Sequence, residues 1–179
     1  LVSFRELAGG SIALVDVDKE EVVWAMRGAW MSQHDADVAA DGNIMLFDNR
    51  GDTEATGRSR VIEIDPGSGG GITWAYTGTE ESRLESRIRA SQQIQPNGNV
   101  LITESNGGRI LEVTRGGEIV WEYINPVRVG EQIHKGDNGL KGELIPIVSW
   151  AQRIDTEFLQ AGFRSDILGN NLTKQELQQ

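Results

Sequence analysis

His34, Asp35 and Asp37 lie within four residues of one another, and His34 is one of only two histidines in the 179-residue chain. A neutral imidazole can act as a nucleophile or a general base near neutral pH, and together with carboxylates it can ligate a metal ion. Because side chains alternate along a strand, Asp35 is expected to point away from His34, which disfavours a compact three-ligand site. The segment therefore predicts a reactive histidine without a metal or another cofactor. The alternative is a structural histidine held by hydrogen bonds.

Three segments of the chain share one pattern, in which an alternating apolar strand and a polar turn precede a second strand that holds a tryptophan; they span 11–28, 59–78 and 108–126. Trp24, Trp74 and Trp121 follow one another at intervals of 50 and 47 residues. The turns at 41–43 and 97–99 read Asp-Gly-Asn and Asn-Gly-Asn, and they supply the positive φ of a tight hairpin. A repeat of about 48 residues with four short antiparallel strands is typical of a blade, so the sequence predicts an all-β protein with the β-propeller fold.

The predicted domain is a partial propeller over 1–154, with complete blades at 34–78 and 89–126. Their strands are expected at 34–39, 43–49, 60–65 and 71–77, and at 89–95, 99–105, 109–114 and 118–124. Residues 1–28 would supply only three strands of an earlier blade. After Pro126 a Gly-rich linker leads to a further inner strand, which is expected at 143–154. Short helices are expected in the tail 155–179. Since about four to eight blades close a propeller, we expect this sequence to be the C-terminal part of a longer chain. The alternative is a ring completed by self-association through open blade edges.

The internal repeat offers a comparison for His34. Aligning the two hairpin turns places His34 at the position of Ala90, so the architecture does not require a histidine there. Arg5, Asn49 and Ser105 share one position at the end of the second strand of each blade. The first strand of a blade starts, and the second ends, on the same face of the disc. We therefore expect His34 and Arg5 to border the mouth of the central channel, where propellers bind ligands.

Composition sets limits on the partners. The 22 glycines and only 4 prolines favour short strands joined by tight turns. A net charge of −10 argues against nucleic acid or an anionic membrane surface as a partner. The chain has no cysteine, so it has neither disulfides nor thiolate metal sites. No apolar run approaches the length of about 18 residues that a membrane span needs.

A family resemblance adds to this reading. The segment "QHDADVAADGNIMLFDNRGD", followed by "SRVIEIDP" and "WAYTG", resembles the bacterial arylsulfotransferases that use aryl sulfate esters directly as donors. The segments "LVSFREL" and "PNGNVLITESNGGRILEVTRGGEIVWEYINP" are similar to other blades of that family, and the likeness covers about residues 1–126. The resemblance implies a six-bladed propeller, a periplasmic or secreted location, and a channel histidine that carries the sulfuryl group. That histidine matches His34, and the arginine that assists it matches Arg5.

The resemblance thus predicts ping-pong transfer of a sulfuryl group from an aryl sulfate to a phenol through a sulfohistidine at His34, without a cofactor. Arg5 would stabilise the sulfonate oxygens, Asn49 would orient the imidazole or the sulfate, and Asp35 would contribute to substrate binding. Two alternatives stay open: a non-catalytic propeller that binds a ligand or a protein partner at its channel face, and a hydrolase with a channel metal. For residues 1–179 alone we expect little or no activity, because only part of the channel wall would be present.

Overall fold

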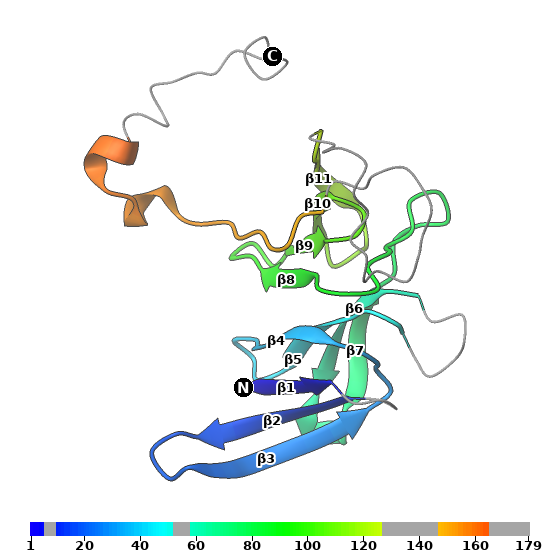
Figure 1. Cartoon of the computed structure of the whole chain (residues 1–179), viewed down its shortest axis with the longest axis vertical. Coiled ribbons are helices and arrows are strands. Elements are labelled where there is room, and N and C mark those ends of the chain that lie inside the picture. The colour runs from blue at the N-terminus through cyan, green and yellow to red at the C-terminus, as the bar shows by residue number, and fades with distance from the viewer. Residues whose placement is uncertain (6–9, 52–57, 127–146, 165–179) are drawn as a thin grey trace.

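The structure is a computed structural model that describes residues 1–5, 10–51, 58–126 and 147–164. It is all-β, with three antiparallel sheets that lie one above the other in Figure 1. The strands of the first sheet are β1 (Val2–Arg5), β2 (Gly10–Asp16) and β3 (Glu21–Gly28). Those of the second are β4 (His34–Val38), β5 (Ile44–Asp48), β6 (Arg60–Asp65) and β7 (Gly71–Tyr76), and those of the third are β8 (Ser91–Ile94), β9 (Val100–Glu104), β10 (Arg109–Val113) and β11 (Ile119–Ile124).

The three sheets share a detail of strand register. The last strand pair of each sheet has a bulge at the equivalent place, between Leu14 and Val15, between Glu63 and Ile64, and between Glu112 and Val113. The tryptophan of each sheet lies beside that bulge, opposite Leu14, Glu63 or Glu112. The sheets therefore have the blade-like form that the sequence predicts. The three sheets that the structure describes do not close into a ring.

The second sheet lies between the other two, and its middle strands β5 and β6 are buried on both faces. Along β5, Met45 and Phe47 pack toward the third sheet, while Ile44 and Leu46 pack toward the first. All four of these side chains are almost completely inaccessible to solvent. Alternation along a strand thus builds two apolar layers, which hold the three sheets face to face and fix the ends of β4 and β5.

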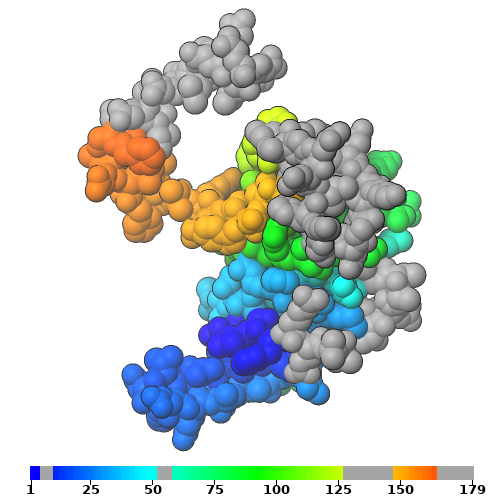
Figure 2. All heavy atoms as spheres, in the orientation of Figure 1, coloured from blue at the N-terminus to red at the C-terminus, as the bar shows by residue number. Residues whose placement is uncertain are grey.

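Residues 147–164 lie along the third sheet and then leave it (Figures 1 and 2). Of the inner strand expected at 143–154, residues 143–146 lie outside the described residues, and residues 147–154 form no strand. At Arg153 the segment contacts β8 through a side chain: the Gln93 amide donates to the Arg153 carbonyl at 3.1 Å and accepts from the Arg153 N–H at 2.8 Å. A side-chain amide therefore makes the hydrogen bonds that a backbone ladder would make.

Helix is scarce in the described part of the chain. It comprises two 3-10 turns, η1 (Pro66–Ser68) and η2 (Thr156–Phe158), and a short helical turn at 161–164. The expected helices of the tail are thus seen only as far as residue 164, because 165–179 lie outside the described residues, as does the Gly-rich linker after Pro126. None of the described helices is both long and apolar enough to cross a membrane.

Candidate functional site

The imidazole of His34 is held by its Nδ1 atom. This atom lies 2.7 Å from the Asn49 side-chain oxygen and 3.0 Å from the Ser32 carbonyl oxygen. The Asn49 amide nitrogen faces two carbonyl oxygens, those of Ser86 at 2.6 Å and Arg89 at 2.7 Å, so it must be the donor there. Both partners of Nδ1 are therefore acceptors, and Nδ1 carries the proton. The neutral ring then has its lone pair on Nε2, which makes Nε2 the nucleophilic atom.

Asn49 can set the tautomer because it is itself immobilised. It follows the end of β5 and is 1% exposed. The Ser59 hydroxyl donates to the Asn49 carbonyl at 2.9 Å and accepts from the Ser86 N–H at 2.8 Å. Residues from two separate segments thus hold Asn49, by its main-chain carbonyl and by its amide nitrogen, and its side-chain oxygen is left to face His34.

A register shift in the β4–β5 ladder decides which residue of β5 lies opposite His34. His34 lies opposite Phe47, the fourth residue of β5, and the pairing slips by one residue between His34 and Asp37. In the third sheet, Ser91 lies opposite Thr103, the fourth residue of β9. The residue that replaces His34 in the ladder is therefore Ser91, not the Ala90 that counting from the turn predicts. Counting fails because the bulge adds a residue to β4.

Asp35 and Asp37 anchor β4 to the neighbouring sheet. The Asp35 carboxylate accepts from the Gln92 N–H at 2.7 Å, and its carbonyl accepts from the Gln92 amide at 3.1 Å. The same amide donates to the Asp37 carboxylate at 3.3 Å. Burial raises the pKa of both carboxyl groups. Asp35 has a φ of 54°, a left-handed conformation that aspartate tolerates better than most residues. The structure thus brings Asn49 to His34 and directs the Asp35 carboxylate to β8.

Gln33 connects the histidine strand to the first sheet. Its buried side-chain amide donates to the Phe4 carbonyl at 2.9 Å and to the Ser11 carbonyl at 3.1 Å. A Cβ atom at Gly10 would lie 1.8 Å from the Gln33 side-chain oxygen, so a larger residue there would have to displace the Gln33 amide from its hydrogen bonds. Arg5 follows Phe4, and its backbone pairs with Gly10 in the β1–β2 ladder. Sequence reasoning treats Gln33 as part of a motif and assigns it no role.

A buried ion pair fixes the segment before β4. Asp48 is fully buried, and its carboxylate accepts from the Met31 N–H at 2.9 Å and from the Arg60 Nε at 2.9 Å. The Arg60 guanidinium also donates to the Ala29 carbonyl. Burial outweighs these hydrogen bonds and raises the pKa of Asp48 from its ordinary value of 3.8 to about 6. Asp48 and Arg60 lie opposite each other in the β5–β6 ladder, and sequence patterns do not show that the carboxylate is fully buried.

The described residues contain no group of three or more histidine, cysteine, aspartate or glutamate side chains that could hold a metal ion. What the site offers instead is one half-buried imidazole with a fixed tautomer, at the end of a strand that two sheets hold in place. This arrangement suits nucleophilic catalysis.

Comparison with known proteins decides the family. The family model described as "Arylsulfotransferase (ASST)" matches residues 1–126. The chain belongs to the arylsulfotransferase family. The resemblance noted from the sequence is therefore confirmed, and membership supports an arylsulfotransferase-type function, that of a transferase, at the level of the family. The matched region contains all three sheets and His34.

No curated protein matches the chain. Among solved structures, the arylsulfotransferase-family chain is similar to a crystal structure of a protein of unknown function from Bacteroides caccae. The two are 16% identical, with a TM-score of 0.40, and the match covers 65% of this chain and 39% of that one. The chain thus spans well under half the length of the structure that it matches.

Proposed function

We propose that His34 takes the sulfuryl group of an aryl sulfate on its Nε2 atom and passes it to a phenol. One observation carries the proposal: the Asn49 side-chain oxygen, 2.7 Å from Nδ1, fixes the tautomer that leaves the Nε2 lone pair free. The family supports transfer of this kind.

The reaction divides into two displacements at sulfur. In the first, the Nε2 lone pair forms the N–S bond, the bond from sulfur to the aryl oxygen breaks, and the phenolate leaves and takes a proton from solvent. The ring then carries a positive charge, which the Asn49 oxygen stabilises by accepting the Nδ1–H hydrogen bond. In the second, the oxygen of the acceptor phenol attacks sulfur, the N–S bond breaks, and the phenol proton is released. His34 returns to its neutral form.

Both steps pass through a loose transition state with charge spread over the sulfonate oxygens, as in phosphoryl transfer. We assign Arg5 to those oxygens, since β1 ends beside the strand of His34 through the Gln33 hydrogen bonds. A planar guanidinium can donate to two oxygens at once. Electrostatic stabilisation of this type contributes on the order of 3 kcal/mol per donor.

The three sheets are proposed to be blades of a larger propeller, with His34 at its channel and with a periplasmic or secreted location. Supporting this, the sheets share one bulged register and pack face to face through two apolar layers. Further channel residues would come from other blades.

The test uses the full-length protein with 4-nitrophenyl sulfate as donor and phenol as acceptor. We expect release of nitrophenol, parallel lines in double-reciprocal plots, and an acid-labile adduct of one sulfuryl group on His34. His34→Ala should abolish all three. Ser91→Ala, the replacement at the matching ladder position of the third sheet, should leave them unchanged. Turnover that survives His34→Ala would reject the mechanism, and phenol binding without any turnover would favour a binding protein.

A further inference from the structure

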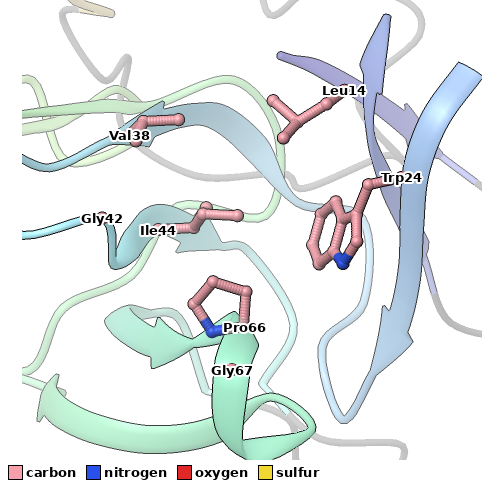
Figure 3. A pocket seen from close by; sticks show the side chains of 7 residues that line it. All are labelled: Leu14, Trp24, Val38, Gly42, Ile44, Pro66 and Gly67. Atoms are coloured by element: carbon pink, nitrogen blue, oxygen red, sulfur yellow. The ribbon is translucent and has the colours of Figure 1, made fainter.

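An apolar pocket of about 340 Å³ lies between the first and second sheets (Figure 3). Leu14 and Trp24 line it from the first sheet, and Val38, Ile44 and Pro66 line it from the second. Its volume falls in the range of small-molecule sites. Val38 ends β4, whereas His34 begins it, so the pocket lies at the opposite end of a five-residue strand. At about 3.3 Å per residue the two are roughly 13 Å apart, and the pocket is distinct from the site of His34.

The corresponding space between the second and third sheets is filled. There, the Arg115 guanidinium lies 4.9 Å from the centre of the Trp74 ring and forms an ion pair with Glu63. The Trp74 indole N–H donates to the Arg115 carbonyl at 2.9 Å. The position beside this tryptophan is therefore built to hold a flat group against the indole, and the carboxylate of Glu63 supplies the charge that a cation needs.

The interface between the first and second sheets has the equivalent indole, that of Trp24, but neither of the two charged residues. Trp24 lies opposite Leu14 at the bulge, where Trp74 lies opposite Glu63. Pro66 is the third residue after the bulge of its sheet, as Arg115 is in the next. Proline is too short to cover the ring, so the space stays open, and leucine provides no partner for a cation. Within the described residues the Trp24 indole N–H makes no hydrogen bond.

We propose that this pocket binds a planar, uncharged aromatic compound, which stacks on Trp24 in the place that Arg115 takes on Trp74. The aliphatic side chains of Leu14, Val38 and Ile44 would surround its edge. Aromatic stacking in offset geometry adds to the burial of apolar area. Because the lining offers no charged side chain, an aromatic ammonium or carboxylate would have to give up its hydration without a partner.

Fluorine NMR of fluorobenzene with the full-length protein tests this. We expect line broadening with the wild-type protein that unlabelled indole reverses. The double variant Leu14→Glu/Pro66→Arg, which places the Glu63–Arg115 pair in the pocket, and the variant Trp24→Ala should each weaken binding about tenfold or more. Val38→Phe, which fills the pocket from the side, serves as a third test if the double variant does not fold.

Two controls locate the binding. Trp121→Ala removes the equivalent tryptophan of the third sheet, and His34→Ala removes the proposed nucleophile, so both should leave the broadening unchanged. 4-Fluorobenzylammonium, the charged counterpart of the probe, should bind more weakly than fluorobenzene. No broadening with folded wild-type protein, or equal broadening in all variants, would overturn the proposal.

Discussion

The Nδ1 atom of His34 lies 2.7 Å from the side-chain oxygen of Asn49, and the Asn49 amide nitrogen is bound by the carbonyl oxygens of Ser86 and Arg89. The two carbonyls belong to the connection between β7 and β8, not to the strand of the histidine. The protonation pattern of one imidazole is thus set by the packing of two neighbouring sheets. The folded protein, and not the histidine alone, decides which ring nitrogen is free.

Substituting Asn49 tests this relationship. In Asn49→Ala the ring loses the shorter of its two Nδ1 hydrogen bonds and keeps only the one to the Ser32 carbonyl, so it can turn, and kcat with 4-nitrophenyl sulfate should fall by about 10²-fold, the cost of a misplaced reacting group. Nitrogen NMR of His34 should then show a part of the population with its lone pair on Nδ1, which would tie the loss of kcat to the imidazole and not to a general loss of folded protein. Ser105→Ala changes the matching residue of the third sheet and should leave kcat unchanged. An unaltered kcat and tautomer in folded Asn49→Ala would contradict the assignment.

Gly10 and Gln33 should be energetically coupled. Alanine at Gly10 would push its Cβ into the Gln33 side chain, and displacing the Gln33 amide from its hydrogen bonds should cost about 1–3 kcal/mol of unfolding free energy. Gln33→Ala removes the obstacle, so the double variant should lose less stability than the sum of the two single variants. Urea unfolding of the four proteins measures this coupling. If the losses of unfolding free energy in the two single variants add up to that of the double variant, Gly10 and Gln33 are not coupled.

The strands could be predicted because their signals are local. In the second sheet the predicted 34–39 and 60–65 correspond to β4 (His34–Val38) and β6 (Arg60–Asp65). Apolar alternation sets the face of each strand, and the turn at Gly42, with a φ of 90°, sets where the hairpin reverses. Neither signal depends on residues far away in the chain.

The geometry around His34 could not be predicted in the same way, because tertiary contacts create it. The bulge in β4 relies on the hydrogen bonds of Asp35 to Gln92, 57 residues later. Residues Arg89 and Ala90 have φ values of 60° and 76°, which delays the start of β8 from the expected 89 to Ser91. The periodic pattern of apolar residues does not indicate hydrogen bonds between residues so far apart in the chain.

Asp35 offers a test of anchoring against substrate binding. Asp35→Ala removes the acceptor for the Gln92 N–H and leaves a residue with a Cβ but without polar stabilisation at a φ of 54°, so unfolding free energy should fall by about 1–3 kcal/mol. Asp35→Asn keeps an acceptor oxygen and suits this φ, so it should lose less. An unchanged KM for the donor in Asp35→Asn would support anchoring, whereas a raised KM at full stability would support the contact with substrate that the sequence predicts.

The buried carboxyl of Asp48 should make stability depend on pH. Its pKa is about 6 in the folded protein against an ordinary value of 3.8, so between these pH values the folded state binds more protons than the unfolded state. The contribution of Asp48 to stability is therefore greatest below about pH 4 and declines, by up to about 3 kcal/mol, as the pH rises to about 6. Urea unfolding at several pH values should show this decline in the wild-type protein, and the difference from Asp48→Asn isolates it.

Glu104 of the third sheet allows the same measurement of stability against pH at a second buried carboxyl group. Glu104 ends β9 as Asp48 ends β5, it pairs with Arg109, and burial raises its pKa as well. Glu104→Gln should therefore remove a part of the pH dependence in the same direction as Asp48→Asn, because both carboxyl groups prefer their protonated form in the folded state. A wild-type stability that rises between pH 4 and 6 relative to both variants would contradict this. It would mean that the ion pairs with Arg60 and Arg109 outweigh the cost of burying the two carboxylates.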